Sequence, residues 1–285
     1  MLIIIGSIIV FASVVGGYLL EHGNLSVLFQ PVELLIIGGA ALGGLIIMSP
    51  MRVIKDIISS VLRALAGKSF SKSDYMDSLL MLSEIFTKIR KEGLVSIEAD
   101  VDSPRESRIF GGHPIFLKNH HAVALVTDTL RTVMTTSISS YELENMLDNE
   151  LEAHHEESMA PAKVLNTVSE ALPGLGIVAA VLGVILTMAK MKEPPEILGA
   201  SIGAALVGTF LGVLLCYGFV GPLSKNLEVM AADDKEYLVV LKMGIIAFIG
   251  GAAPQIAVEF ARRAIPGHAK PSFAEVEDAL RANKK

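Results

Sequence analysis

The sequence predicts an all-α membrane protein with four transmembrane helices, a large helical cytoplasmic insertion between spans 2 and 3, and a helical cytoplasmic tail. Composition is the first reason. Of the 285 residues, 52% are hydrophobic and 19% are charged, and the mean hydropathy is +0.55, whereas soluble domains carry about 25% charged residues. The second reason is that uncharged residues gather in runs long enough to cross a bilayer. The third is the helical periodicity of the sequence between those runs.

Four uncharged runs are long enough to span a membrane. They cover residues 1–20, 34–51, 171–189 and 197–224, and contain 20, 18, 19 and 28 residues. About 20 helical residues cross the roughly 30 Å of hydrocarbon, and a charged side chain at its centre costs about 2.5–3.5 kcal/mol. The first run lacks the basic start of a signal peptide and is longer than its apolar part. We therefore interpret all four runs as membrane spans.

A fifth apolar run, residues 243–258, is interpreted differently. It has only 16 residues, includes glycines, a proline and a glutamine, and is flanked by Lys242 and Glu259. We expect a cytosolic helix that packs on the rest of the protein.

The distribution of basic residues predicts the orientation. None lies between Glu21 and Glu33, 13 lie in residues 51–170, two lie in the link before the fourth span, and nine follow Pro222. Because basic residues concentrate on the cytoplasmic side, we expect both termini and both large polar segments to be cytoplasmic. The predicted domains are a transmembrane hairpin over 1–51, a cytoplasmic helical domain over 52–170, a second transmembrane hairpin over 171–224 and a cytoplasmic helical tail over 225–285.

The insertion is predicted to be helical because its apolar residues recur at spacings of three and four. Gly93 is expected to end the first of its long helices. Ser103, Pro104 and Glu106 have the order of a cap, a first-turn proline and a capping-box acid, and predict that a helix starts there. The periodic residues are Met76, Leu79, Leu80, Ser83, Ile85, Phe86 and Ile89.

The spans lack an ionisable residue at mid-membrane depth. Coupled transporters normally carry one at their binding site, and the nearest candidate here is Glu33, at the outer end of the second span, which we interpret as an interfacial residue. If ions cross an assembly of this chain, the titrating group is expected to come from another chain. This chain would then contribute the walls of the path.

Small residues in the spans predict close helix packing. Gly39 and Gly43, Gly199 and Gly203, and Gly208 and Gly212 form three pairs at the spacing that lets helix backbones approach in a membrane. Packing within the chain explains each pair, although with this many small faces some are expected to meet other subunits.

Two prolines and a threonine stand out in the later spans. Pro173 and Pro222 lie at the cytoplasmic ends of the third and fourth spans, where a proline ends or bends a helix. Termination is the simpler interpretation, and the matching depth of the two residues favours a hinge. Thr209 is the hydroxyl residue of the fourth span best placed to line a wet path, although a membrane threonine often bonds its own backbone.

Other functional classes find little support. The net charge of −6 argues against nucleic acid as a partner. The single cysteine, Cys216, can form neither an internal disulfide nor a cysteine-rich metal site. The acidic segment with His154 and His155 lacks metal-ligand spacing, and no catalytic triad or nucleotide-binding loop occurs. We expect no enzyme activity, no bound metal and no cofactor.

The order of these segments and four stretches of sequence resemble the MotA family of flagellar motor stator proteins. The stretches are RKEGLVSIEADVDSPRESRIF at 90–110, ALPGLGIVAAVLGV at 171–184, LVGTFLGVLLCYGFVGPL at 206–223, and PQIAVEFARR with PSFAEVE in the tail. The resemblance covers essentially the whole chain.

The resemblance implies partners and roles. In that family a ring of MotA chains, thought to be five, surrounds two MotB chains whose aspartate carries the ion. The complex lies in the bacterial inner membrane and acts on the rotor protein FliG. Arg90 and Glu98 match the family's rotor-interaction charges, Pro173 and Pro222 its conformationally important prolines, and Thr209 its channel-lining threonine.

The ion is expected to be a proton. The resemblance implies that Ala180 and Gly208 line the channel, as Thr209 does. Sodium-type relatives tend to have hydroxyl residues at these two positions, so a sodium-driven stator subunit is the less favoured alternative. Two others remain. One is an ExbB/TolQ-like energiser subunit, but such subunits usually have three spans and not four. The other is a self-sufficient channel or transporter, which a mid-membrane acid in this chain would have favoured.

Overall fold

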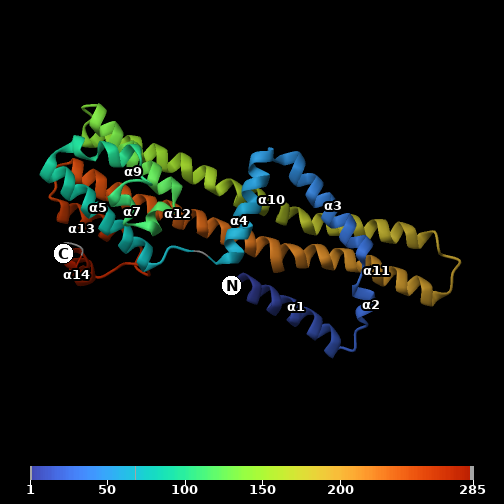
Figure 1. Cartoon of the computed structure of the whole chain (residues 1–285). Coiled ribbons are helices and arrows are strands. Elements are labelled where there is room, and N and C mark those ends of the chain that lie inside the picture. The colour runs from blue at the N-terminus through green and yellow to red at the C-terminus, as the bar shows by residue number, and fades with distance from the viewer. Residues whose placement is uncertain (1, 68, 283–285) are drawn as a thin grey trace. The chain divides into compact units, whose positions relative to one another are not determined.

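The computed structural model describes residues 2–67 and 69–282, in which helices are joined by turns and loops and no β-strand occurs. The chain forms two compact units (Figure 1). Met1–Lys68 and Ser158–Met230 form what we call the apolar unit, and Ser69–Glu157 and Ala231–Lys285 form what we call the charged unit. Two long helices contribute to both.

The apolar unit contains the predicted spans. Four helices are long and apolar enough to cross a membrane, and they begin at Leu2, Leu25, Ser140 and Pro195. The sequence prediction of four spans is therefore confirmed. The elements are α1 (Leu2–Leu20), α2 (Leu25–Leu28), α3 (Pro31–Met48), α4 (Met51–Ala66), the end of α10 (Ser140–Met188), α11 (Pro195–Leu214), the π-helix η2 (Leu215–Val220) and the start of α12 (Gly221–Ile249).

The second span starts and ends for local reasons. Helix α3 begins at Pro31, three residues before the uncharged run, because proline needs no hydrogen-bond partner at the first helical position. It ends at Met48 because Ser49, which precedes Pro50, is extended, as residues before proline generally are. A separate amphipathic helix, α4, then starts at Met51 and buries Val53, Ile57 and Ala64.

The prolines do not end their helices, so termination was the wrong interpretation. Pro173 lies inside α10, which continues to Met188. Pro222 lies just after η2, where the helix widens: the Gly221 N–H donates to the Cys216 carbonyl, five residues back. A π-turn rearranges the hydrogen bonds around a residue that lacks an N–H. Both helices therefore cross the boundaries expected at 170/171 and 224/225 from the sequence.

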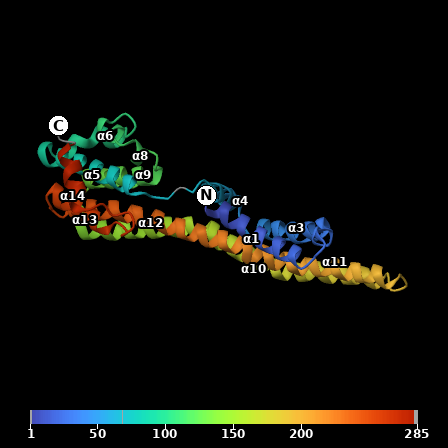
Figure 2. The ribbon, with the colours of Figure 1, turned by 90° about the horizontal axis from the view of Figure 1, so that it is seen from below.

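Helices α10 and α11 lie side by side (Figures 1 and 2), and glycines let their backbones come into contact. A Cβ added to Gly212 would lie 2.5 Å from the Leu172 carbonyl oxygen and 2.8 Å from the Gly176 Cα, and one added to Gly176 would lie 2.7 Å from the Gly208 oxygen. The pair Gly208 and Gly212 thus packs within the chain. The other two pairs do not: a Cβ at Gly39, Gly43 or Gly199 would meet nothing within 4 Å, and one at Gly203 only the end of Val27.

The charged unit is built around α5 (Lys72–Glu92). Its apolar face buries Leu79, Leu82, Ile85 and Phe86, as the spacing predicts. The same core includes residues 245, 248, 257 and 258, so the fifth apolar run packs on protein as predicted, but it forms parts of two helices, separated at residues 250–253, and not one helix. The other elements are the 3-10 helix η1 (Leu94–Ile97), α6 (Glu98–Asp102), α7 (Arg108–Gly111), α8 (Pro114–Leu117), α9 (His120–Thr135), the start of α10, the end of α12, α13 (Pro254–Ala264) and α14 (Phe273–Ala282).

One predicted helix start is wrong. Gly93 does end α5, with a φ of +89° that favours glycine, but no helix begins at Ser103. Its carbonyl accepts from the backbone N–H groups of Glu106 and Ser107, which closes a turn. The cap is Ser107, whose Oγ accepts from the N–H groups of Ile109 and Phe110 at the start of α7. The residues from Ser103 to Glu106 therefore form a turn. The helix that starts after Ser107 has only four residues, which is too short for its periodicity to show in the sequence.

Candidate functional site

The apolar unit encloses a carboxyl group. Glu33, in the first turn of α3, is only 8% exposed, and its Oε2 is buried without a hydrogen-bond partner. It points at two glycines: a Cβ on Gly208 of α11 would lie 2.9 Å from Oε2, and one on Gly183 of α10 would lie 3.6 Å from Oε1. The interpretation of Glu33 as an interfacial residue is therefore wrong. The first turn of α3 lies beside Gly208 of α11 and Gly183 of α10, so the Glu33 carboxyl is packed between three helices.

The residues expected to line a channel divide between two places. Gly208 is buried against α10, where an added Cβ would lie 3.1 Å from both the Ala179 Cβ and the Ala180 N. Thr209, the next residue, faces about 100° away and lines a shallow hollow of about 380 Å³ with Val213 and Tyr217. The structure thus brings Ala180 and Gly208 together with Glu33, and places Thr209 on another face of α11.

The two prolines lie in a helix pair joined by side-chain hydrogen bonds. Ser169 of α10 donates to the Cys216 carbonyl in η2 (3.2 Å), and Ser224 of α12 donates to the Ala162 carbonyl of α10 (3.0 Å). Pro173 and Pro222 each lie within four residues of one of these bonds, so a change in bend at either proline would act on the same pair of helices.

The predicted charged residues lie on either side of a tight turn in the charged unit. Arg90 is in the last turn of α5 and Glu98 is the first residue of α6, and both are exposed. Gly93 and η1 connect the two helices. Within the described residues neither the Arg90 nor the Glu98 side chain takes part in a hydrogen bond or ion pair, so both charges are available to another molecule.

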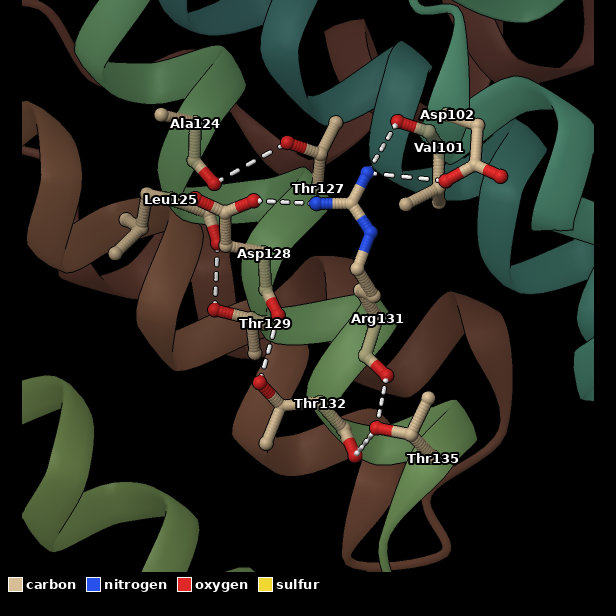
Figure 3. A network of polar contacts seen from close by, with 10 residues as sticks. All are labelled: Val101, Asp102, Ala124, Leu125, Thr127, Asp128, Thr129, Arg131, Thr132 and Thr135. Atoms are coloured by element: carbon tan, nitrogen blue, oxygen red, sulfur yellow. Dashed lines mark hydrogen bonds and ion pairs between the residues drawn. The ribbon is translucent and has the colours of Figure 1, made fainter.

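Side-chain contacts, partly buried around Asp100 and exposed around Arg131, connect the elements of this turn. The Lys88 Nζ lies 2.7 Å from the Asp100 Oδ2, and Ser107 donates to the other Asp100 oxygen at 2.6 Å. Arg131 of α9 reaches α6 with its guanidinium, which donates to the Asp102 carboxylate at 3.0 Å and to the Val101 carbonyl (Figure 3). These contacts connect α6 to α5, α7 and α9. They do not use the Arg90 and Glu98 side chains, which stay exposed to solvent.

A cavity of about 550 Å³ lies beside Arg90, between α5, α13 and α14. Its wall includes Glu259, whose carboxylate accepts hydrogen bonds from Arg262 (2.7 Å) and Arg263 (2.8 Å). The bonds from Arg262, helped by those from Arg263, lower the pKa of Glu259 to about 2. An ion pair of 2.6 Å between Lys72 and Glu275 ties α14 to α5.

Sequence reasoning missed the burial of Glu33 and the anchoring role of Arg131. A signal existed for Glu33: it follows Pro31, which starts a helix well, so the span could have been extended backwards to include it. Arg131 gave no comparable signal, because its partners on α6 are 29 and 30 residues away.

Comparison with known proteins identifies relatives along the whole chain. Residues 4–93 match the family described as Motility protein A N-terminal, and residues 117–235 match the MotA/TolQ/ExbB proton channel family. The chain is 38% identical to Motility protein A of Salmonella typhimurium, over 99% of this chain and 96% of the relative. It is also 38% identical to Motility protein A of Escherichia coli (100% and 96%), and 32% identical to Chemotaxis protein LafT of Vibrio parahaemolyticus (97% and 97%).

Two solved structures share the fold. The C. jejuni MotAB structure superposes with a TM-score of 0.77 at 19% identity, over 95% of this chain and 98% of that one. The flagellar MotAB stator complex from Bacillus subtilis gives a TM-score of 0.70 at 24% identity, over 98% of both chains.

Proposed function

The chain belongs to the MotA/TolQ/ExbB proton channel family, and on that premise we propose how it works as a stator subunit of the bacterial flagellar motor. It is a non-enzymatic inner-membrane subunit that acts in an oligomeric complex with a MotB partner. The observation that carries this function is the 38% identity to Motility protein A over nearly the full length of the chain. The ExbB/TolQ-like alternative loses support, since residues 4–93 match the Motility protein A N-terminal family as well.

The ion path is proposed to be shared with MotB. Between Ala171 and Met188 and between Ile197 and Leu214 this chain has no ionisable residue, so the aspartate that carries the ion is proposed to be MotB's. Thr209, Ala180 and Gly208 are proposed to line the path. Small, apolar Ala180 and Gly208 are typical of a proton path, and we propose that the transported ion is a proton and not sodium.

The cytoplasmic parts are proposed to deliver the torque. With both termini inside, the charged unit faces the cytoplasm, where exposed Arg90 and Glu98 would meet opposite charges on FliG of the rotor. Five copies of this chain are proposed to surround the MotB dimer. Pro173 and Pro222 are proposed to be the points at which ion binding changes the bend of the helix pair that joins the membrane spans to the charged unit.

Proton flux tests the shared path. Vesicles are prepared with the chain alone, with the chain and MotB, and with the chain and a MotB whose membrane aspartate is replaced by asparagine. We expect flux only in the second preparation, and we expect it to persist without sodium. Equal flux from the chain alone would contradict a shared path, and flux that needs sodium would contradict the choice of ion.

A further inference from the structure

Glu33 is the one charged side chain buried in the described part of the apolar unit. The residue is only 8% exposed, and Oε2 is buried and has no hydrogen-bond partner. The carboxyl does not cap its own helix, because no backbone N–H of α3 donates to it. Its position in the first turn of α3 therefore does not account for its burial.

Two glycines leave the volume that the carboxyl fills. A methyl group on Gly208 would approach Oε2 to 2.9 Å, and one on Gly183 would approach Oε1 to 3.6 Å. These glycines come from α11 and α10, so the carboxyl is held by three helices. The Cβ atoms of Ala179 and Ala205 lie beside the same two glycines, 3.1 Å from a Cβ added to Gly208 and 2.7 Å from one added to Gly183. We call this arrangement the Glu33 cradle.

No counter-charge faces the cradle within the described residues. Helix α10 has no ionisable residue from Ala171 to its end at Met188, and α2 has none. The ionisable residue of α11 is Glu196, an acid that is 12 residues, or more than three helical turns, before Gly208. An ionised carboxylate with no cation nearby and with one oxygen buried without a donor is strongly disfavoured at such a place, whereas the neutral carboxyl is tolerated.

From the geometry of the cradle we propose that Glu33 is a proton-binding site of this chain, with the proton resident on the carboxyl at neutral pH. This goes beyond the function proposed above, in which the acid that carries the ion belongs to MotB. The site is built from one acid and two glycines of the same chain, so every copy in the complex would have its own.

A hydrophobic carbodiimide tests the site, because it modifies protonated carboxyls in apolar surroundings. The carboxyl proton passes to a carbodiimide nitrogen, the oxygen bonds to the central carbon, and an acyl shift from oxygen to nitrogen leaves a stable N-acylurea without a leaving group. The complex with MotB, in membranes at pH 7, is treated with dicyclohexylcarbodiimide, and the Glu33 peptide is measured by mass spectrometry. We expect the label on Glu33 and none on exposed Glu196. With a water-soluble carbodiimide and an added amine, which displaces the urea and leaves a stable amide, we expect the label on Glu196 and none on Glu33.

The Glu33→Gln variant supplies the control. Glutamine has the same shape and cannot be labelled, so the complex should assemble normally and its peptide should stay unmodified. The infrared difference between the wild-type and variant complexes should also contain the C=O band of a protonated carboxyl. A difference spectrum without that band, or equal labelling of Glu33 and Glu196 by the water-soluble reagent, would overturn the proposal. Because both signals come from Glu33 itself, a complex that moves no protons would contradict the proposed function and not this site.

Discussion

At the scale of single residues, the structure separates charges that hold the fold from charges that are free. Arg131 and Lys88 are engaged with acids on α6, whereas Arg90 and Glu98 are exposed and engage nothing in the described chain. A charge with no partner in its own molecule can be reversed without breaking an internal contact. Function and stability can therefore be tested separately at these positions.

The first prediction concerns Arg90. We expect Arg90→Glu to reduce swimming speed while the amount of folded protein in the membrane is unchanged, because the exposed Arg90 side chain makes no ion pair within the described chain that the change would break. A compensating charge reversal on FliG should restore speed, since complementary fields set orientation and encounter. Arg105→Glu, also at an exposed arginine, is the matched control. Normal swimming of the Arg90→Glu strain would mean that Arg90 is an ordinary solvated residue with no role in torque.

The second prediction concerns pH and Glu259. Its pKa is lowered from 4.5 to about 2 in the folded protein, so the ionised carboxylate stabilises the fold above pH 4.5 and loses this effect as the pH falls toward 2. The melting temperature of the wild type should thus exceed that of Glu259→Gln at neutral pH, and the difference should shrink on acidification. A difference that is independent of pH would show that the Arg262 and Arg263 bonds do not act through the charge.

At the scale of helices, contact between α10 and α11 depends on glycine. Because backbone atoms and not flexible side chains occupy the space beside Gly212, an added methyl group can be accommodated only if the helices separate. The same substitution at Gly199 meets nothing within 4 Å. Two glycines that look alike in sequence therefore differ in what they do.

The third prediction follows from that difference. Gly212→Ala should lower the free energy of unfolding of the detergent-solubilised chain by about 1–3 kcal/mol, the usual cost of overpacking. Gly199→Ala should leave it unchanged or raise it slightly, because alanine is the better helix former. Both are measured by thermal unfolding followed by circular dichroism. Equal stabilities of the two variants would mean that α10 and α11 do not approach as closely as the structure has them.

The fourth prediction concerns the prolines, which lie inside continuous helices. Pro173→Ala or Pro222→Ala restores a backbone donor and should favour a regular α-helix, so assembly with MotB should survive while rotation falls. Membrane abundance, MotB co-purification and swimming speed are compared with those of Pro266→Ala, which lies outside the spans. Normal swimming with both span variants would rule out a coupling role, and loss of assembly would indicate a folding role instead.

At the scale of the whole molecule, the proposed topology sets which surfaces face each side of the membrane. The chain offers a clean way to test it, because its one cysteine, Cys216, is buried. An introduced surface cysteine can therefore be read with little background labelling. The short link containing α2 is expected outside, and the charged unit inside.

The fifth prediction is a labelling pattern. In intact cells a membrane-impermeant maleimide should label Ser26→Cys, in the link between the first two spans, and should not label Ser71→Cys, at the start of α5. After permeabilisation both should react. Labelling of Ser71→Cys in intact cells would reverse the proposed orientation, and the unsubstituted protein provides the background of Cys216.

The sequence by itself determined the helical class, the four spans, the fifth run packed on protein and the buried face of α5. Each of these follows from hydrophobicity and its period along one segment, which does not depend on distant residues. The resemblance in 90–110 and in the later spans also pointed to the correct family, and the comparisons confirm it.

Only the tertiary structure decided what depends on residues far apart in the chain. Pro222 could be absorbed by a π-turn because α10 lies alongside and Ser169 bonds to the Cys216 carbonyl. Glu33 became buried because glycines of two later helices leave room for its carboxyl. The hydrophobic period of a segment indicates whether it is a helix and which face it buries. Whether Glu33 faces water or a neighbouring backbone depends on glycines 150 or more residues away, and these come beside it only when the helices pack.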